Sequence, residues 1–136
     1  MSTLQQAYKD IRLKKKPHKT APGLKRCPQV RGSIARVRVL TPRKPNSARR
    51  PVAKVKLVNR RRVTAHVPGI GHTLRKHADV LIRGGGARDL PGVQYSCCRG
   101  VYDLHGVVDK RKRRSVYGVP RPLSEKKKLR RRFRKI

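Results

Sequence analysis

The chain has 136 residues, room for one domain with a modest core, and it carries 39 lysines and arginines against 6 acidic residues. Its formal net charge of +33 repels itself strongly unless a polyanion neutralises it, whereas a free domain of this size usually lies within about eight charges of neutrality. Basic residues are in excess in every third of the chain, which predicts contact with nucleic acid on many sides, and the scarcity of acids argues against acid–base catalysis.

The first segment predicts a short helix followed by a basic arm. Residues 3–11 place apolar side chains at helical spacing, with Ser2 or Thr3 as the N-cap. Residues 12–26 contain two prolines, one glycine and few apolar side chains, so they bury too little surface to fold alone. We therefore assign residues 1–27 to a basic N-terminal extension that RNA orders.

From residue 28 to residue 106 the sequence predicts a small β barrel. Apolar and basic side chains alternate with the two-residue period of half-buried strands in SIARVRVL and PVAKVKLV. RVTAHV and DVLIRGG predict two further strands, and VQYSCCRGVYDL a weaker fifth. Five short strands separated by Gly, Pro and Asn loops favour an all-β fold, a five-stranded barrel of the oligonucleotide-binding type. The side chains expected to face its core in the first two strands are Ala35, Val37, Val39, Ala53, Val55 and Leu57.

The outer surface of this barrel and the C-terminal tail are both basic. Lys54 and Lys56 take the outward positions of the second strand, so we expect them to contact phosphates or sugars of RNA; a solvated strand face is the alternative. Residues 107–136 form a basic tail in which Ser124 can cap a terminal helix. Such a tail needs phosphates around it to become ordered.

A first loop, TPRKPNSARR, covers residues 41–50 between the first two predicted strands. Pro42 and Pro45 stiffen it, because each restrains its own φ and the residue before it. Asn46 and Ser47 carry an amide and a hydroxyl that can bind the minor-groove edges and 2′-hydroxyls of RNA. An ordinary turn with an Asx-type hydrogen bond explains the same residues.

A second loop, RGGGARDLPGVQY, starts with three consecutive glycines that allow close approach of the backbone. It lacks both the Gly-Lys-Ser/Thr ending and the spaced glycines of the nucleotide-binding motifs. Asp89, one of the few acids, lies within it. The plain interpretation of Asp89 is a local salt bridge or a turn cap.

Metal, cofactor and membrane sites find little support. Adjacent Cys97 and Cys98 cannot form an ordinary bridge, and no pair that includes Cys27 has metal-ligand spacing. His72 and His77 lie five positions apart, and we do not expect an acid to complete a facial triad with them. No apolar run approaches the roughly 18 residues of a membrane helix. We expect no metal, no cofactor and no membrane contact.

Six strings follow one another along the chain: CPQVRG from Cys27, TPRKPNSA from Thr41, PGIGH from Pro68, VLIRGG from Val80, RDLPGVQY from Arg88 and RSVYGVPRP from Arg114. In this order they resemble the S-twelve family of ribosomal proteins over residues 3–122. TPRKPNSA followed at this separation by RDLPGV is the most specific part of the resemblance.

The resemblance implies a non-catalytic protein that binds small-subunit rRNA, organises the decoding centre and influences translational accuracy. Its implied partners are that rRNA, neighbouring small-subunit proteins and, indirectly, mRNA and tRNA at the A site. In bacterial members the aspartate matching Asp89 can carry a β-methylthio group. By position, the decoding-centre residues are Lys44, Pro45, Asn46, Ser47, Arg88, Asp89, Leu90, Pro91 and Gly92. The side chains expected on the rRNA backbone are Arg43, Lys54, Lys56, Arg111, Arg113 and Arg114.

Departures from the family pattern bear on the compartment. Arg49 and Pro51 replace an apolar and a basic residue, and Ile70 and Lys76 replace acids. The drift toward basic residues in NRRRVTAHVPG is most similar to mitochondrial members, so we expect a mitochondrial location, with a plastid or the bacterial cytoplasm as alternatives.

The rival function is a free single-strand RNA-binding or chaperone module. That module needs stacking aromatics, and the chain has four Tyr, one Phe and no Trp.

Overall fold

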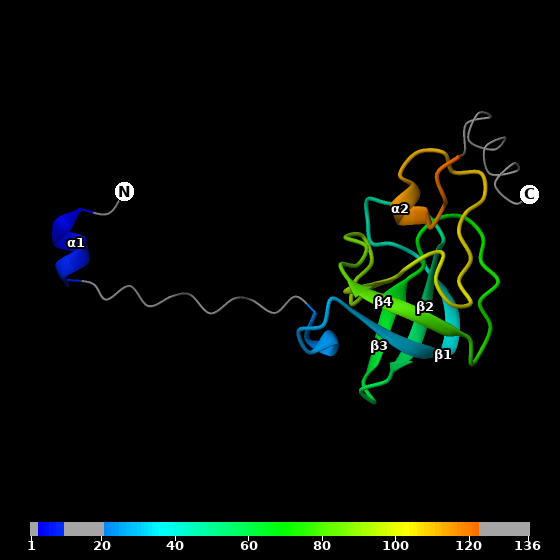
Figure 1. Cartoon of the computed structure of the whole chain (residues 1–136), viewed down its shortest axis with the longest axis horizontal. Coiled ribbons are helices and arrows are strands. Elements are labelled where there is room, and N and C mark those ends of the chain that lie inside the picture. The colour runs from blue at the N-terminus through cyan, green and yellow to red at the C-terminus, as the bar shows by residue number, and fades with distance from the viewer. Residues whose placement is uncertain (1–2, 10–20, 123–136) are drawn as a thin grey trace, which may run out of the picture.

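Five strands close into a barrel in this computed structural model, which describes residues 3–9 and 21–122 (Figure 1). The strands pair in the order β1-β2-β3-β5-β4, and β4 returns to pair with β1. All pairs are antiparallel except β3 with β5. The predicted all-β fold with a five-stranded barrel is confirmed. The bounds are β1 Gln29–Leu40, β2 Arg50–Leu57, β3 Arg62–His66, β4 Asp79–Gly84 and β5 Tyr95–Cys97.

The inward face of β1 differs from the prediction because the strand carries a bulge. The register with β2 shifts between Ile34 and Arg36, so the alternation of inward and outward side chains is broken at Ala35. Ile34 is buried and Ala35 is exposed, so the assignment of Ala35 to the core was wrong. Val37 is half-buried, but Val39 lies opposite Pro51 and remains 59% exposed, so its assignment was wrong as well.

The prediction for β2 is confirmed. Ala53, Val55 and Leu57 are buried, whereas Lys54 and Lys56 between them are exposed. The core that these side chains enter also includes Ile34, Ala65, Val67, Val80, Ile82, Tyr95, Cys97 and Leu104. Burial raises the pKa of the Cys97 thiol to about 12, so this cysteine packs in the core as a neutral side chain.

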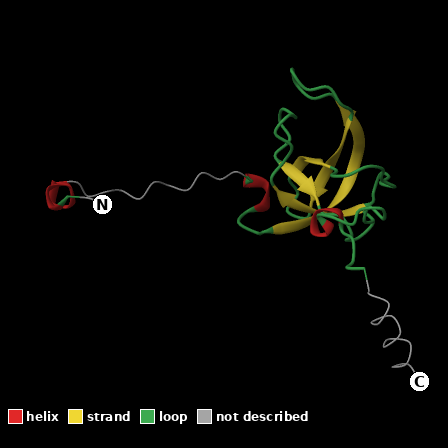
Figure 2. Cartoon of the chain, turned by 90° about the horizontal axis from the view of Figure 1, so that it is seen from above, coloured by secondary structure: helices red, strands yellow, loops and turns green. Residues whose placement is uncertain are grey.

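Segments on both sides of residues 28–106 pack against the barrel (Figure 2). The 3₁₀ helix η1, Pro22–Leu24, places Leu24 in the core, and the Gly23 N–H donates to the Tyr95 hydroxyl at 2.8 Å. After the barrel, the Val107 N–H donates to the Tyr117 carbonyl at 3.0 Å and so holds the short helix α2, Arg114–Tyr117. This helix lies against the barrel segment, because a Cβ at Gly69 would be only 3.2 Å from Cδ1 of Tyr117. The division of the chain at residues 27/28 and 106/107 stays a prediction.

The first helix, α1, spans Leu4–Lys9, within the segment where the sequence predicts one. Most of the predicted basic arm and the predicted terminal helix after Ser124 lie outside the described residues. Over the described ranges, no helix combines the length and apolar character needed to cross a membrane. Within those same ranges, no three His, Cys, Asp or Glu side chains are grouped as a metal ion would require, and all three cysteines are free.

Candidate nucleic-acid interface

The two loops that the sequence singles out meet at one end of the barrel. The β1–β2 loop, residues 41–49, and the β4–β5 loop, residues 85–94, are joined by the Arg43 N–H, which donates to the Asp89 carbonyl at 3.1 Å. In barrels of the oligonucleotide-binding type these two loops border the face that binds nucleic acid. The fold therefore brings together residues that are more than forty positions apart in the family motifs.

An ion pair strengthens this junction. Arg50, the first residue of β2, donates from Nε to Oδ2 of Asp89 at 2.6 Å, and its Nη2 lies 2.5 Å from the same oxygen. The Asp89 side chain is only 14% exposed, which limits the competition from water. Asp89 thus makes a salt bridge, as its plain interpretation in the sequence suggests. Its partner, however, lies where the β1–β2 loop ends and not in the turn that contains Asp89.

Apolar packing anchors the β4–β5 loop beneath its exposed residues. A second cluster of buried residues, separate from the barrel core, consists of Val52, Leu90 and Val93, with Leu40 and Ala87 against it. Gly86 has no room for a side chain, because a Cβ there would lie 1.9 Å from the carbonyl oxygen of Val93. Leu90 therefore supports the loop from below and does not present its side chain at the surface.

The remaining predicted residues line the exposed tips of the two loops. Within the β1–β2 loop the Asn46 N–H donates to the Arg43 carbonyl at 3.1 Å, which closes a turn, and the Lys44–Pro45 peptide bond is cis. Gly92 turns the second loop with φ +74°, a conformation that favours glycine. The exposed residues of the predicted set are Lys44, Pro45, Asn46, Ser47, Arg88, Pro91 and Gly92.

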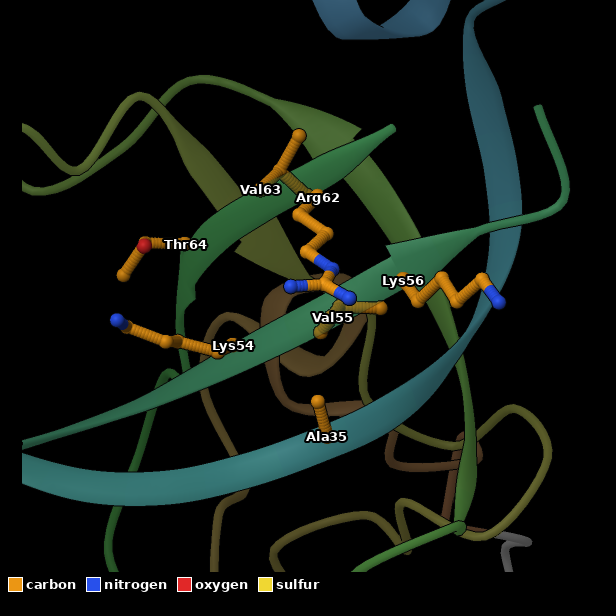
Figure 3. Close-up of a pocket in the computed structure, with 7 residues that line it drawn as sticks. All are labelled: Ala35, Lys54, Val55, Lys56, Arg62, Val63 and Thr64. Atoms are coloured by element: carbon orange, nitrogen blue, oxygen red, sulfur yellow. The ribbon is translucent and has the colours of Figure 1, made fainter. Parts of the chain in front are cut away.

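The outer wall of the barrel adds a hollow of about 450 Å³ over β2 and β3 (Figure 3). Lys54 lies opposite Thr64, and Lys56 lies opposite Arg62, so these four side chains share the outward face. Figure 3 shows the Arg62 guanidinium reaching from β3 across β2, between the two lysines. On residues 21–122 neither lysine forms a salt bridge, so both ammonium groups are available to an external anion.

Comparison with known proteins identifies the family. The family model of ribosomal protein S12/S23 matches residues 17–128. The chain belongs to this family. A relative from Paramecium tetraurelia, the small ribosomal subunit protein uS12m, is 61% identical over 110 residues, which cover 81% of this chain and 79% of the relative.

Membership makes this S12/S23 protein a structural constituent of the ribosome's small subunit rather than an enzyme. The predicted family is confirmed. Because the Paramecium relative is a mitochondrial form, the predicted mitochondrial location is confirmed as well.

His66 is a site residue of this S12/S23 protein that sequence reasoning missed. It ends β3, opposite Val52, and its imidazole is half-buried near the Arg50–Asp89 pair. Burial lowers the pKa of His66, and the Arg50 cation lowers it further, while the Asp89 carboxylate acts in the opposite direction. His66 therefore tends to stay neutral beneath the loops, and its location came only from the pairing of β2 with β3.

Arg99 is a second residue that the sequence did not single out. Its guanidinium is buried and donates to three backbone carbonyls: Nε to Pro68 at 2.7 Å, Nη2 to Gly71 at 2.6 Å and Nη1 to His105 at 3.1 Å. Burial lowers the pKa of Arg99, but arginine keeps its charge in proteins. Arg99 thus fastens the loop that contains the family string PGIGH to the segment after β5. Its one sequence signal is a cation that follows the two adjacent cysteines at the end of the fifth predicted strand.

The predicted backbone-contacting arginines of this S12/S23 protein lie in three places. Arg43 is exposed at the base of the β1–β2 loop. Arg111 and Arg113 are exposed before α2, and Arg114, its first residue, is half-buried. These arginines and the Lys54/Lys56 wall therefore lie on different elements: the β1–β2 loop, the segment at α2 and strand β2.

Proposed function

We propose that this protein binds small-subunit rRNA, organises the decoding centre and thereby influences translational accuracy. The observation that carries the proposal is the junction of the two loops, in which Asp89 accepts from both Arg43 and Arg50. That junction converts two family motifs into one exposed surface at the end of a basic barrel.

The cluster of cations on the barrel wall supports the first part of this proposal. Lys54, Lys56 and Arg62 share one outward face, with Arg36 beside Lys54 across the β1–β2 pair. Cations that replace the condensed counterions of RNA release those ions, which favours binding and makes it depend on salt. We assign the same role to the predicted contacts Arg43, Arg111, Arg113 and Arg114.

The joined loops support the second part. Lys44 offers a charge-assisted hydrogen bond to a phosphate, and Asn46 and Ser47 offer short donors and acceptors suited to the edges and 2′-hydroxyls of RNA in its shallow groove. Because Arg50 and the Val52–Leu90–Val93 cluster hold the loops together, a contact made at one loop is transmitted to the other. Contacts that differ between an open and a closed subunit shift the balance between these states. The protein then acts on mRNA and tRNA at the A site only indirectly, through rRNA.

Modification of Asp89 stays a proposal that rests on the resemblance alone. Its carboxylate is committed to Arg50 and its backbone carbonyl to Arg43, so a methylthio group on its β-carbon would sit at the junction of the two loops. The intact mass of the protein from purified small subunits tests the modification directly.

Two measurements test the proposed function. The protein should sediment with the small subunit through a moderate salt wash, and ultraviolet crosslinking in that subunit should join residues 43–47 and 88–92 to rRNA near the decoding site. A transient RNA chaperone, the rival function, should wash off. Its need for several stacking platforms also fits poorly, because on residues 21–122 Tyr95 is buried, Tyr117 is half-buried and only Tyr102 has an exposed ring. Stable association with crosslinks to rRNA remote from the decoding site would overturn the decoding role.

A further inference from the structure

A second hollow, of about 400 Å³, lies at the end of β1 and β2 that faces away from the two loops. Its lining combines three cations with one acid, and it includes an exposed valine. Figure 3 shows Lys56 directed along β2 away from Lys54, so this lysine serves the second hollow as well as the wall. The side chains that line it include Arg31, Lys56, Val58, Arg60 and Asp79.

Arg31 is held in this hollow from two sides. Its Nη2 forms an ion pair and hydrogen bond with Oδ2 of Asp79, and its guanidinium carbon lies over the Tyr102 ring, 5.3 Å from the centroid. The Arg31 side chain nevertheless remains 54% exposed. A planar guanidinium backed by an aromatic ring is a preorganised surface on which a nucleobase can stack.

Tyr102 presents an exposed ring from a strained backbone conformation. Its φ of +54° is a conformation that a tyrosine rarely adopts, and its side chain is half exposed. Two hydrogen bonds hold this segment in place: the Asp79 N–H donates to the Asp103 carboxylate at 2.7 Å, and the Asp103 N–H donates to the Asp79 carbonyl at 3.2 Å. The fold thus maintains a strained turn that carries an exposed ring, and no packing of that ring in the core accounts for it.

Asp79 is the feature that distinguishes this hollow from the cationic wall. A carboxylate repels phosphate, so it does not suit contact with the RNA backbone. It only accepts hydrogen bonds, and its side chain is 34% exposed, so it can bind a nucleobase edge that carries N–H donors. Lys56 and Arg60 in the same hollow supply the positive charge for flanking phosphates, and Val58, 73% exposed, supplies apolar contact.

We propose that this hollow binds one unpaired nucleotide of rRNA, with its base stacked on the Arg31–Tyr102 pair and its N–H-bearing edge hydrogen-bonded to Asp79. Guanine suits the site, because its Watson–Crick edge presents N–H donors, and Oδ1 of Asp79 can accept from that edge while Oδ2 is held by Arg31. The phosphates on either side lie on Lys56 and Arg60. This inference rests on the proposed binding of rRNA, but it concerns the opposite end of the strands from the decoding loops and uses none of their residues.

Chemical probing of rRNA in purified small subunits tests it. Tyr102→Gly removes the ring and suits the positive φ, so the turn is retained; Tyr102→Phe keeps the ring. Asp79→Asn keeps the size of the side chain and removes one acceptor oxygen. Val108→Ala, at an 88% exposed position outside the hollow, is the matched control. Reagents that modify the Watson–Crick edges of guanine, and of adenine and cytosine, are read out by primer extension.

We expect one and the same base to become roughly fivefold or more reactive in Tyr102→Gly and Asp79→Asn, as the loss of a stacking or edge partner predicts. That base should be unchanged in Tyr102→Phe and Val108→Ala. If subunits with a full complement of either variant protein show no newly reactive base, the inference is wrong. Crosslinks from position 102 to a neighbouring protein would overturn it in favour of a protein-binding surface. If rRNA bases beside Lys54 and beside the two loops stay protected in these variants, the proposed function still stands. If the unmodified subunit shows no such protection, the proposed function and this inference both fail.

Discussion

Arg50 and Asp89 are 39 positions apart in the sequence, yet Nε and Nη2 of Arg50 lie 2.6 Å and 2.5 Å from the same oxygen of Asp89. Both donors converge on one acceptor, and the acid also accepts the Arg43 N–H through its backbone carbonyl. The pair therefore links the start of β2 to both loops of the proposed decoding surface. The strength of this pair decides whether a contact made at one loop also moves the other loop.

Breaking this pair should loosen both loops at once. Arg50→Gln should weaken the junction by about 1 kcal/mol, a value reduced from that of a buried pair because the Arg50 side chain is 37% exposed. Amide hydrogen exchange should accelerate in residues 43–47 and 88–92 together, while the exposed neighbour Arg49→Gln should change neither. A double-mutant cycle with Asp89→Asn checks the cause, because fully additive effects would mean that the pair does not couple the loops.

The pKa of His66 should shift in opposite directions when Arg50 and when Asp89 is neutralised. Its lowered pKa means that the unfolded chain takes up a proton before the folded one, so stability is unaffected above about pH 6.5 and falls as the pH drops below that value toward the folded pKa. Arg50→Gln should raise the pKa of His66, and Asp89→Asn should lower it further. NMR titration of the imidazole ring measures both shifts, and shifts of the same sign would contradict this account. His66→Gln should flatten the pH dependence of stability in that range.

Substitution of Arg99 should lower the free energy of unfolding more than substitution at most other positions of the barrel. Arg99→Met fills similar space but leaves three carbonyls without their donor: the buried carbonyl of Pro68 and the partly buried hydrogen-bond sites at Gly71 and His105. A buried carbonyl without a donor costs about 1–3 kcal/mol, and the two partly buried ones cost less because water reaches them, so we expect about 2–3 kcal/mol in total. Arg99→Lys should have an intermediate effect, because a single ammonium cannot reproduce the fork of donors. Thermal unfolding measures the cost. Arg83→Met, at an exposed position on β4, is the control and should lie close to the unmodified protein.

Lys44 and Asn46 should affect decoding differently. Loss of the Lys44 charge should weaken its hold on rRNA by about 1 kcal/mol and favour the open subunit, so Lys44→Ala should make decoding stricter and slower with little loss of assembly. Asn46→Ala should impair decoding itself, because its amide is exposed at the tip of the loop. A misreading assay beside a count of assembled subunits measures both, with the exposed Arg75→Ala as control. An unchanged error frequency and elongation rate in Lys44→Ala would mean that this loop does not tune accuracy.

The sequence by itself determined the features that depend on local pattern. The charge of +33 predicts a polyanionic partner, the two-residue period predicts the strands, and TPRKPNSA with RDLPGV identifies the family before any coordinate is known. The inward set of β2 followed directly from its alternation, because that strand pairs without interruption from Val52 to Lys56 with β3. In β1 the same rule failed at Ala35, because a bulge depends on the register with a neighbour and leaves no reliable mark in composition.

Only the tertiary structure decided which distant residues meet. Closure of the barrel places Arg50 on Asp89, Arg31 on Asp79 and Tyr102, and Arg99 on the carbonyls of Pro68, Gly71 and His105. The physical reason is that strand register and barrel closure decide which carbonyl or carboxylate each arginine meets, and both are long-range properties. Because every residue has a backbone carbonyl, the sequence does not mark the ones that an arginine will bind. A chain with an arginine or lysine at more than a quarter of its positions therefore reveals what it binds, while the few cations that instead hold the protein together become visible only once the strands are paired.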